Sequence, residues 1–196
     1  ALKHPTGSMG AVVTINSATL VNKGLEIIEA HYLFGLPYSD IKAVIHPQSV
    51  VHSLVEFNDG STIAQASPPN MKGAIAYAMN WPNRLSKSTA PIDWSIPHTW
   101  TFAPINAKQF PSVDLARHCG EVGGGLPAIF NAANEVAVAA FISKKLEFKS
   151  IVGVIAGVVA DLEKDSPKTL RDLSDVSALE DDARTRAQAH LLRLAP

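Results

Sequence analysis

Polar side chains with complementary chemistry share one face of a helix predicted near the start of the chain. At about 100° per residue, Asn22 and Lys23 lie within about 60° of Glu26. Lys23 offers a positive charge to a phosphate, Asn22 offers amide donors, and Glu26 offers the hard oxygen that Mg²⁺ or Mn²⁺ prefers. Ser17 adds a hydroxyl near the predicted helix start, where backbone N–H groups favour anions. The full polar face consists of Thr19, Asn22, Lys23, Glu26 and Glu29.

The same pattern is also typical of a solvated helix surface. Lys23 and Glu26 are three residues apart and would form the kind of ion pair that surface helices usually carry. Spacing alone therefore favours a plain surface, and a functional interpretation needs further support.

The helix that would position these residues runs from about Ser17 to Gly35. Apolar residues recur along it with helical spacing, and Gly35 followed by Pro37 ends the pattern. We therefore expect one amphipathic helix. Its apolar positions are Leu20, Val21, Leu25, Ile27, Ile28 and Tyr32.

Three strands and a short helix are predicted next. The strands are rich in Val and Ile, and Asp59-Gly60 is the kind of residue pair that forms a tight hairpin. Pro68-Pro69 opens a short helix that ends before Trp81-Pro82. The predicted strands are Lys42–Ile45, Ser49–Phe57 and Ser61–Ala66.

Beyond Pro82 the pattern changes twice. The stretch from Pro82 to Pro111 is rich in proline and has little periodicity, which indicates a linker. Four apolar-periodic stretches follow and predict a small helical bundle; the third is rich in Val, but its length favours a helix over a strand. These stretches are Ser112–Glu121, Pro127–Lys145, Ser150–Lys164 and Val176–Leu194. The predicted fold class is therefore α/β (α+β) with a small sheet over residues 1–82, a linker over 83–111, and an α-helical bundle over 112–196.

Composition excludes several classes of protein. The 196 residues include 17 basic and 18 acidic side chains, so no net field would draw the protein to nucleic acid or to an anionic membrane. No apolar stretch approaches the ~20 residues that a membrane span needs. The single cysteine, Cys119, is expected to be a buried small hydrophobe. The expected partner is a small molecule or another protein.

Several segments, taken in order, resemble one enzyme family. SATLVNKGLEIIEAH, HPQSVVHSLVEFNDGS, PPNM and LPAIFNAANEVAVAAF resemble successive segments of the 1-deoxy-D-xylulose 5-phosphate reductoisomerase family. The resemblance is strongest over residues 1 to about 82. Several unusual segments in the right order rarely arise by chance. The resemblance therefore favours a functional role for the polar helix face over a plain solvated surface.

The resemblance implies an enzyme of the non-mevalonate isoprenoid pathway. The family converts 1-deoxy-D-xylulose 5-phosphate to 2-C-methyl-D-erythritol 4-phosphate by rearranging the carbon skeleton and reducing an aldehyde with NADPH, while Mg²⁺ or Mn²⁺ holds substrate oxygens. Residues 1–82 would then be the C-terminal part of the catalytic domain. The bacterial cytoplasm is the expected location, with a plastid as the alternative.

Matched residue by residue, the resemblance assigns roles to the polar helix and to the segment before it. Lys23 and Glu26 are the expected catalytic residues, and Glu26 is also the expected metal ligand. Gly10 corresponds to a point where the backbone approaches NADPH, within a lid formed by the segment from His4 to Gly10. The positions that correspond to substrate contacts are His4, Ser17, Asn22, Lys23 and Glu26.

Two departures from the family pattern bear on activity. Gly7 stands where the family has a tryptophan in the lid, so an apolar cover over the substrate is lost. The family's nucleotide loop and further metal ligands belong to segments upstream of Ala1, and one carboxylate cannot supply the about six oxygens that a hard divalent ion needs. We therefore expect this chain to be inactive alone. The alternative is a non-catalytic phosphate-binding or dimerisation module derived from this fold.

Two further features carry expectations of their own. His46 and His52 resemble family histidines near the active site, although a structural role in orienting their loop is at least as well supported. The predicted hairpin carries Val55 and Ile63 among other apolar residues, which is more apolar surface than a lone hairpin should expose. Since a comparable strand joins two subunits in the family, we expect a homodimer.

Overall fold

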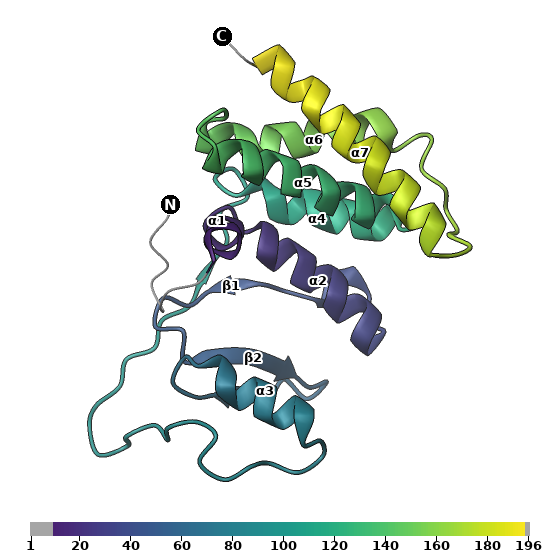
Figure 1. Ribbon diagram of the computed structural model, residues 1–196. Coiled ribbons are helices and arrows are strands. Elements are labelled where there is room, and N and C mark those ends of the chain that lie inside the picture. Colours follow the sequence, from purple (N-terminus) through teal and green to yellow (C-terminus); the bar gives the residue numbers. More distant parts are fainter. Residues whose placement is uncertain (1–9, 195–196) are drawn as a thin grey trace. The chain divides into compact units, whose positions relative to one another are not determined.

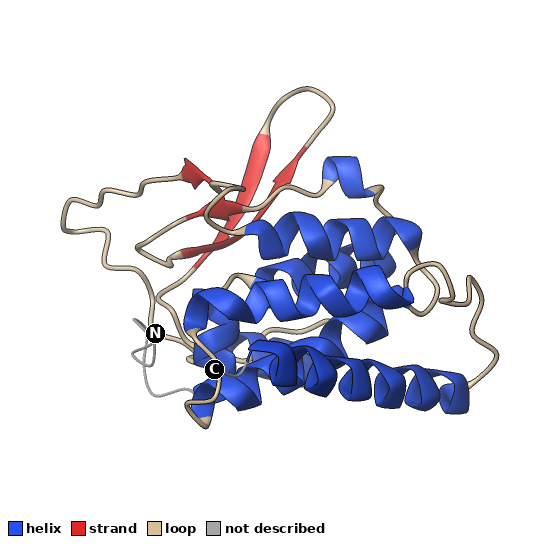
Figure 2. Cartoon of the chain, turned by 90° about the horizontal axis from the view of Figure 1, so that it is seen from above, coloured by secondary structure: helices blue, strands red, loops and turns tan. Residues whose placement is uncertain are grey.

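The chain forms two compact units in the computed structural model, which describes residues 10–194. The first unit contains described residues 10–43 and 106–194, and the second contains residues 44–105. The first unit is helical, and the strands coloured red in Figure 2 belong to the second. The predicted combination of a small sheet with a helical bundle is thereby confirmed.

The polar segment folds as two helices rather than the single helix that the periodicity predicted. Helix α1 spans Ala11–Ala18 and helix α2 spans Val21–Phe34. Between them Leu20 adopts a left-handed backbone with φ 57°, which a right-handed helix cannot continue. The prediction of one helix from Ser17 was therefore wrong at its start, and Ser17 belongs to α1. The predicted end was correct, because Gly35 ends α2 in the left-handed conformation that favours glycine.

The four helices predicted for the C-terminal half are all present. Figure 1 shows them lying side by side, with α5 in contact with α4, α6 and α7. The Val-rich third stretch is a helix, as its length predicted. Its apolar side chains pack inward, and Ile151, Ile155 and Val158 are fully buried. The helices are α4 (Pro111–Val122), α5 (Leu126–Ile142), α6 (Ile151–Leu162) and α7 (Leu173–Leu194).

Helices α1 and α2 pack with this bundle. Helix α2 contacts α4, and α1 contacts α5. This division of the chain differs from the predicted boundaries, which grouped residues 1–82 together. The physical reason is that Val21, Ile27 and Ile28 form an apolar stripe on α2 that is buried in the helical unit. Proline-rich residues 83–105 belong to the second unit.

The second unit holds two small antiparallel sheets and one helix. Strand β2 (Val51–Glu56) pairs with β3 (Thr62–Ala66) through the predicted hairpin, where Gly60 has φ 83° and Asp59 accepts hydrogen bonds from Ser61. Strand β1 (Val44–Ile45) pairs with β4 (Ala103–Pro104), which lies inside the predicted linker. Helix α3 (Met71–Met79) begins after Asn70, whose side chain accepts a hydrogen bond from the Lys72 amide at 2.9 Å.

Candidate functional site

Two of the predicted site residues, Asn22 and Lys23, donate hydrogen bonds to the carboxylate of a third, Glu26. The Asn22 Nδ2 donates a hydrogen bond to Glu26 Oε1 at 2.5 Å, and the Lys23 ammonium donates to Glu26 Oε2. Lys23 and Glu26 remain accessible, with side-chain exposures of 42% and 44%. Their predicted placement on one helix face is confirmed, and a ligand can reach the cation and the carboxylate from solvent.

The opposite face of α2 fixes the orientation of this polar face. Gly24 lies against α4, where a β-carbon added to it would come within 2.6 Å of Ala116 Cβ. Val21 is fully buried beside it. Because α2 is anchored through this apolar side, Asn22, Lys23 and Glu26 must face away from the bundle core.

The turn before α2 sets where Ser17 lies. Ser17 is half-buried in the last turn of α1, and its carbonyl accepts a hydrogen bond from the Leu20 amide at 3.2 Å. Thr19, which helical spacing placed on the polar face, is buried instead, with 4% exposure. Its hydroxyl donates to the Ile15 carbonyl at 3.0 Å. The prediction that Thr19 belongs to the polar face was therefore wrong, because the chain leaves the helix at this residue.

The first turn of α2 presents backbone donors next to these side chains. The amide N–H groups of Asn22 and Lys23 make no backbone hydrogen bond to a described residue, as is normal for the first turn of a helix. Such groups together with a nearby ammonium favour an anion. The local chemistry therefore suits a phosphate.

Glu26 by itself is an incomplete metal site. Within residues 10–194, no group of three or more His, Cys, Asp or Glu side chains is placed to hold a metal ion. A carboxylate oxygen is nevertheless the donor that Mg²⁺ and Mn²⁺ prefer. Glu26 therefore fits one position of a hard-metal site whose other ligands come from elsewhere.

The predicted lid lies mostly outside the described residues, and His4 and Gly7 fall there. Gly10 is described: it precedes α1, is exposed, and its carbonyl accepts hydrogen bonds from the amide and hydroxyl of Thr14. A β-carbon at Gly10 would meet nothing within 4 Å among described residues. Packing within this part of the chain therefore gives no reason for a glycine here.

His46 and His52, which belong to the second unit, serve local structure. His46 Nε2 accepts a hydrogen bond from the Val50 amide at 3.1 Å, so Nδ1 carries the proton that faces the Thr101 carbonyl at 2.9 Å. The ring also stacks on Phe102 at 4.5 Å between centroids. His52 Nε2 lies 3.0 Å from the Ser67 carbonyl. These contacts support the structural interpretation of the two histidines.

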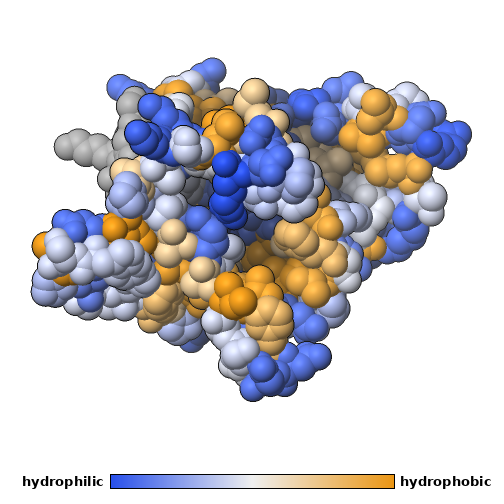
Figure 3. Space-filling model, turned by 90° about the horizontal axis from the view of Figure 1, so that it is seen from below, coloured by the Kyte–Doolittle hydropathy of each residue, from blue (hydrophilic) through white to orange (hydrophobic). Residues whose placement is uncertain are grey.

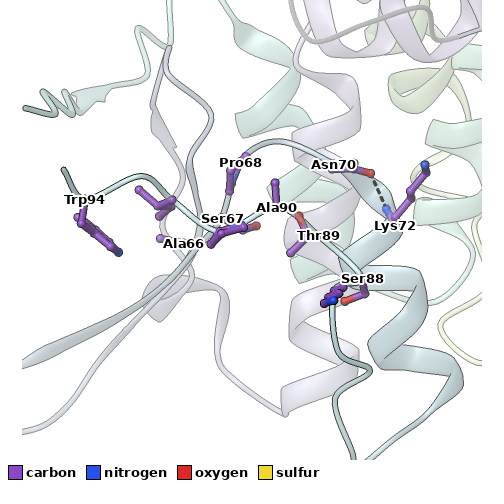
Figure 4. A pocket seen from close by; sticks show the side chains of 12 residues that line it. Ala66, Ser67, Pro68, Asn70, Lys72, Ser88, Thr89, Ala90 and Trp94 are labelled. Atoms are coloured by element: carbon purple, nitrogen blue, oxygen red, sulfur yellow. Dashed lines mark hydrogen bonds between the residues drawn. The ribbon is translucent and has the colours of Figure 1, made fainter. Parts of the chain in front are cut away.

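One cavity belongs to the second unit and includes none of the predicted site residues. It is an open groove of about 840 Å³ between the segment leading into α3 and residues 87–94 (Figure 4). Hydroxyl groups of Ser67, Ser88 and Thr89 line it, with Trp94 at one end. Sequence patterns predicted no groove here, because most of its lining comes from residues 87–94, a segment without periodicity.

Comparisons with known proteins point to the same family as the four sequence segments that resemble it. Residues 66–186 match the family described as "DXP reductoisomerase C-terminal domain", and residues 1–34 match "1-deoxy-D-xylulose 5-phosphate reductoisomerase C-terminal domain". The chain belongs to the 1-deoxy-D-xylulose 5-phosphate reductoisomerase family. The resemblance stated from sequence is thereby confirmed.

Relatives within the reductoisomerase family are similar along nearly the whole chain. The chain is 51% identical to the reductoisomerase of Mycobacterium marinum over 195 residues, which is 98% of this chain and 48% of that protein. It is 53% identical to that of Kitasatospora griseola, covering 96% of this chain and 49% of the relative. The chain therefore spans about half the length of the curated reductoisomerases that it matches.

Solved reductoisomerase structures share the fold. A crystal structure of a reductoisomerase in complex with NADPH, fosmidomycin and magnesium has a TM-score of 0.94 and 37% identity, covering 99% of this chain and 49% of that chain. The enzyme of Zymomonas mobilis in complex with NADPH has a TM-score of 0.84 and 39% identity, covering 92% and 47%. Among the described residues of this chain, none of the helices is both long and apolar enough to span a membrane.

Proposed function

We propose that this chain supplies the phosphate-binding face and one metal ligand of a 1-deoxy-D-xylulose 5-phosphate reductoisomerase. The observation that carries the proposal is the convergence of Asn22, Lys23 and Glu26 at the start of α2. The substrate is 1-deoxy-D-xylulose 5-phosphate and the product is 2-C-methyl-D-erythritol 4-phosphate. The location proposed is the bacterial cytoplasm.

Ser17, Asn22 and Lys23 bind the phosphate end of the substrate. The Lys23 ammonium neutralises phosphate charge, while the Asn22 side chain and the backbone N–H groups at the start of α2 donate hydrogen bonds to its oxygens. The Lys23 ammonium and the Asn22 amide contact Glu26 in the described structure. Binding of a phosphate therefore exchanges these contacts for new ones.

Glu26 becomes available to a divalent ion through the same exchange. Once Lys23 turns to the phosphate, the Glu26 carboxylate offers its oxygens to Mg²⁺ or Mn²⁺ and to substrate hydroxyl groups. When bound, such an ion would polarise a substrate carbonyl, and NADPH would supply the hydride. His4 and Gly10 are proposed to contact substrate and NADPH, respectively. This chain's residues thus hold and orient the substrate.

We propose that the remaining metal ligands and the nucleotide-binding residues lie in the part of the family's full-length enzymes that this chain does not cover. By itself the chain is therefore expected to lack turnover. The alternative, a non-catalytic phosphate-binding or dimerisation module, has Gly7 in the lid as its support in the sequence.

A second copy of this chain is the proposed protein partner. Both strands of the β2–β3 hairpin are largely exposed, and Val55 and Ile63, which lie opposite each other, are 57% and 63% exposed. Apolar side chains also reach the surface on the face shown in Figure 3. A two-stranded hairpin with so much exposed apolar surface is only marginally stable unless another protein surface packs against it.

The test is NADPH oxidation with 1-deoxy-D-xylulose 5-phosphate and Mn²⁺. The chain is assayed alone and then with the separately expressed first half of a relative such as the Mycobacterium marinum enzyme. Turnover only in the mixture is expected, and Glu26→Gln should abolish it, because a neutral amide replaces the charged metal ligand. Glu29→Gln on the same helix is the matched control and should retain turnover. Folded halves that associate without turnover would favour the non-catalytic module.

A further inference from the structure

The turn between α1 and α2 is held by a residue that lies far from it in the sequence. Ser112, fully buried at the start of α4, donates its hydroxyl proton to the backbone carbonyl of Thr19. The two residues are 93 positions apart. Both groups lose their contacts with water when the chain folds, so leaving either without a partner would be costly. The Ser112 hydroxyl is therefore held on the Thr19 carbonyl.

Thr19 in turn joins the ends of the two helices. Its hydroxyl donates to the Ile15 carbonyl in α1 and accepts from the Val21 amide, the first residue of α2, at 3.4 Å. Leu20, the next residue, has a left-handed backbone that is unfavourable for a side chain with a β-carbon. The surroundings must therefore hold this turn, and the contact from Ser112 is one such constraint.

The same face of α4 contacts α2 one turn further along. Ser112 and Ala116 are four residues apart, and Gly24 of α2 lies against Ala116 Cβ and the Ser112 carbonyl. Helix α4 therefore fixes α2 by close packing and fixes the turn by a hydrogen bond. Together these contacts set the position of Ser17 at the end of α1 relative to Asn22 and Lys23 at the start of α2.

We propose that Ser112 is a positioning residue for phosphate binding: its bond to the Thr19 carbonyl holds the α1–α2 turn so that Ser17, Asn22 and Lys23 face one anion. This proposal rests on the proposed function of that face. Ser112 itself is buried and does not contact the anion.

The test measures binding of inorganic phosphate to the ¹⁵N-labelled chain through the amide signals of Asn22 and Lys23. Ser112→Ala should raise the dissociation constant for phosphate about five- to tenfold, because the loss of one buried hydrogen bond loosens the turn. Ser166→Ala is the matched control. It removes another largely buried serine hydroxyl, which has no hydrogen-bond partner among described residues, and should leave phosphate affinity unchanged.

A second variant covers the case in which Ser112→Ala does not fold. Ser112→Cys nearly keeps the size of the side chain but offers only a weak S–H donor to the Thr19 carbonyl, so it should also weaken phosphate binding. A purely structural role would lower the melting temperature and leave the phosphate affinity of the folded chain unchanged.

The outcomes separate the two proposals. Equal phosphate affinity of the unaltered chain and Ser112→Ala, or of the unaltered chain and Ser112→Cys, would overturn the positioning role alone. An unaltered chain that shows no phosphate-dependent shift at Asn22 and Lys23 would overturn the phosphate site, and the positioning role with it.

Discussion

Gly24 of α2 and Ala116 of α4 lie so close that no side chain fits between the two helices. A β-carbon added at Gly24 would lie 2.6 Å from the Ala116 β-carbon, a distance that real β-carbons essentially never show. The glycine therefore sets how closely α2 approaches the helix that carries Ser112, and with it the position of the polar face.

Gly24→Ala should destabilise the chain despite the better helix propensity of alanine. We expect a loss of about 1–3 kcal/mol in the free energy of unfolding, because α2 must move away from α4. Urea unfolding measures this change. Gly153→Ala in α6 is the control, since nothing lies within 4 Å of its added β-carbon among described residues, and it should stabilise by up to about 1 kcal/mol. A neutral or stabilising Gly24→Ala would contradict the packing argument.

Lys23→Met should weaken phosphate binding with little effect on stability. We expect the dissociation constant for inorganic phosphate to rise about tenfold or more, because a charge-assisted contact is lost. Stability should change by about 0.5 kcal/mol or less, since the ion pair with Glu26 is nearly half exposed. Phosphate titration and thermal unfolding provide the two measurements. Lys42→Met, at an exposed lysine after α2, should leave phosphate affinity unchanged.

The Cys119 thiol should not react while the chain is folded. The side chain is fully buried, and burial, assisted by the negative charge of Glu163, raises the pKa of the thiol to about 12. At pH 8 the folded chain should therefore resist a thiol reagent that labels it promptly in denaturant. Rapid labelling of the folded chain, at a rate independent of denaturant, would contradict this burial.

The same raised pKa predicts how stability depends on pH. Above the ordinary thiol pKa of about 9, the unfolded chain loses the proton that the folded chain keeps, so ionisation favours the unfolded state. The contribution is fully present below pH 9 and falls as the pH rises toward 12. Cys119→Ala should lack this part of the alkaline loss, which urea unfolding at pH 8 and pH 10 would measure.

Ile63→Lys should convert the proposed dimer into monomers. Ile63 and Val55 lie opposite each other on the β2–β3 hairpin, and a charge placed there would have to be desolvated in an apolar interface. Light scattering at micromolar concentrations measures the mass. Thr62→Lys is the control, because Thr62 alternates to the other face of the same strand. A mass equal to one chain for the unaltered protein would rule out the dimer.

The sequence by itself determined most of the local structure and the chemistry of the polar face. Asn22, Lys23 and Glu26 share a helix face because their spacing matches the helical period, and Asp59-Gly60 forms the expected hairpin turn. The end of α2 at Gly35 and the helical state of Ile151–Leu162 also follow from local patterns. Such features depend on residues a few positions apart, and these are what periodicity reports.

Only the tertiary structure decided how α2 begins and what surrounds it. Hydrophobic periodicity does not reveal the helix break at Leu20. Leu20 and Val21 continue the apolar spacing, although the backbone of Leu20 is left-handed. The hydrogen bond from Ser112 and the packing of Gly24 on Ala116 join residues about 90 positions apart. These contacts form only when the apolar stripe of α2 is buried against α4, so burial across the fold, rather than spacing along the chain, fixes the geometry of the site.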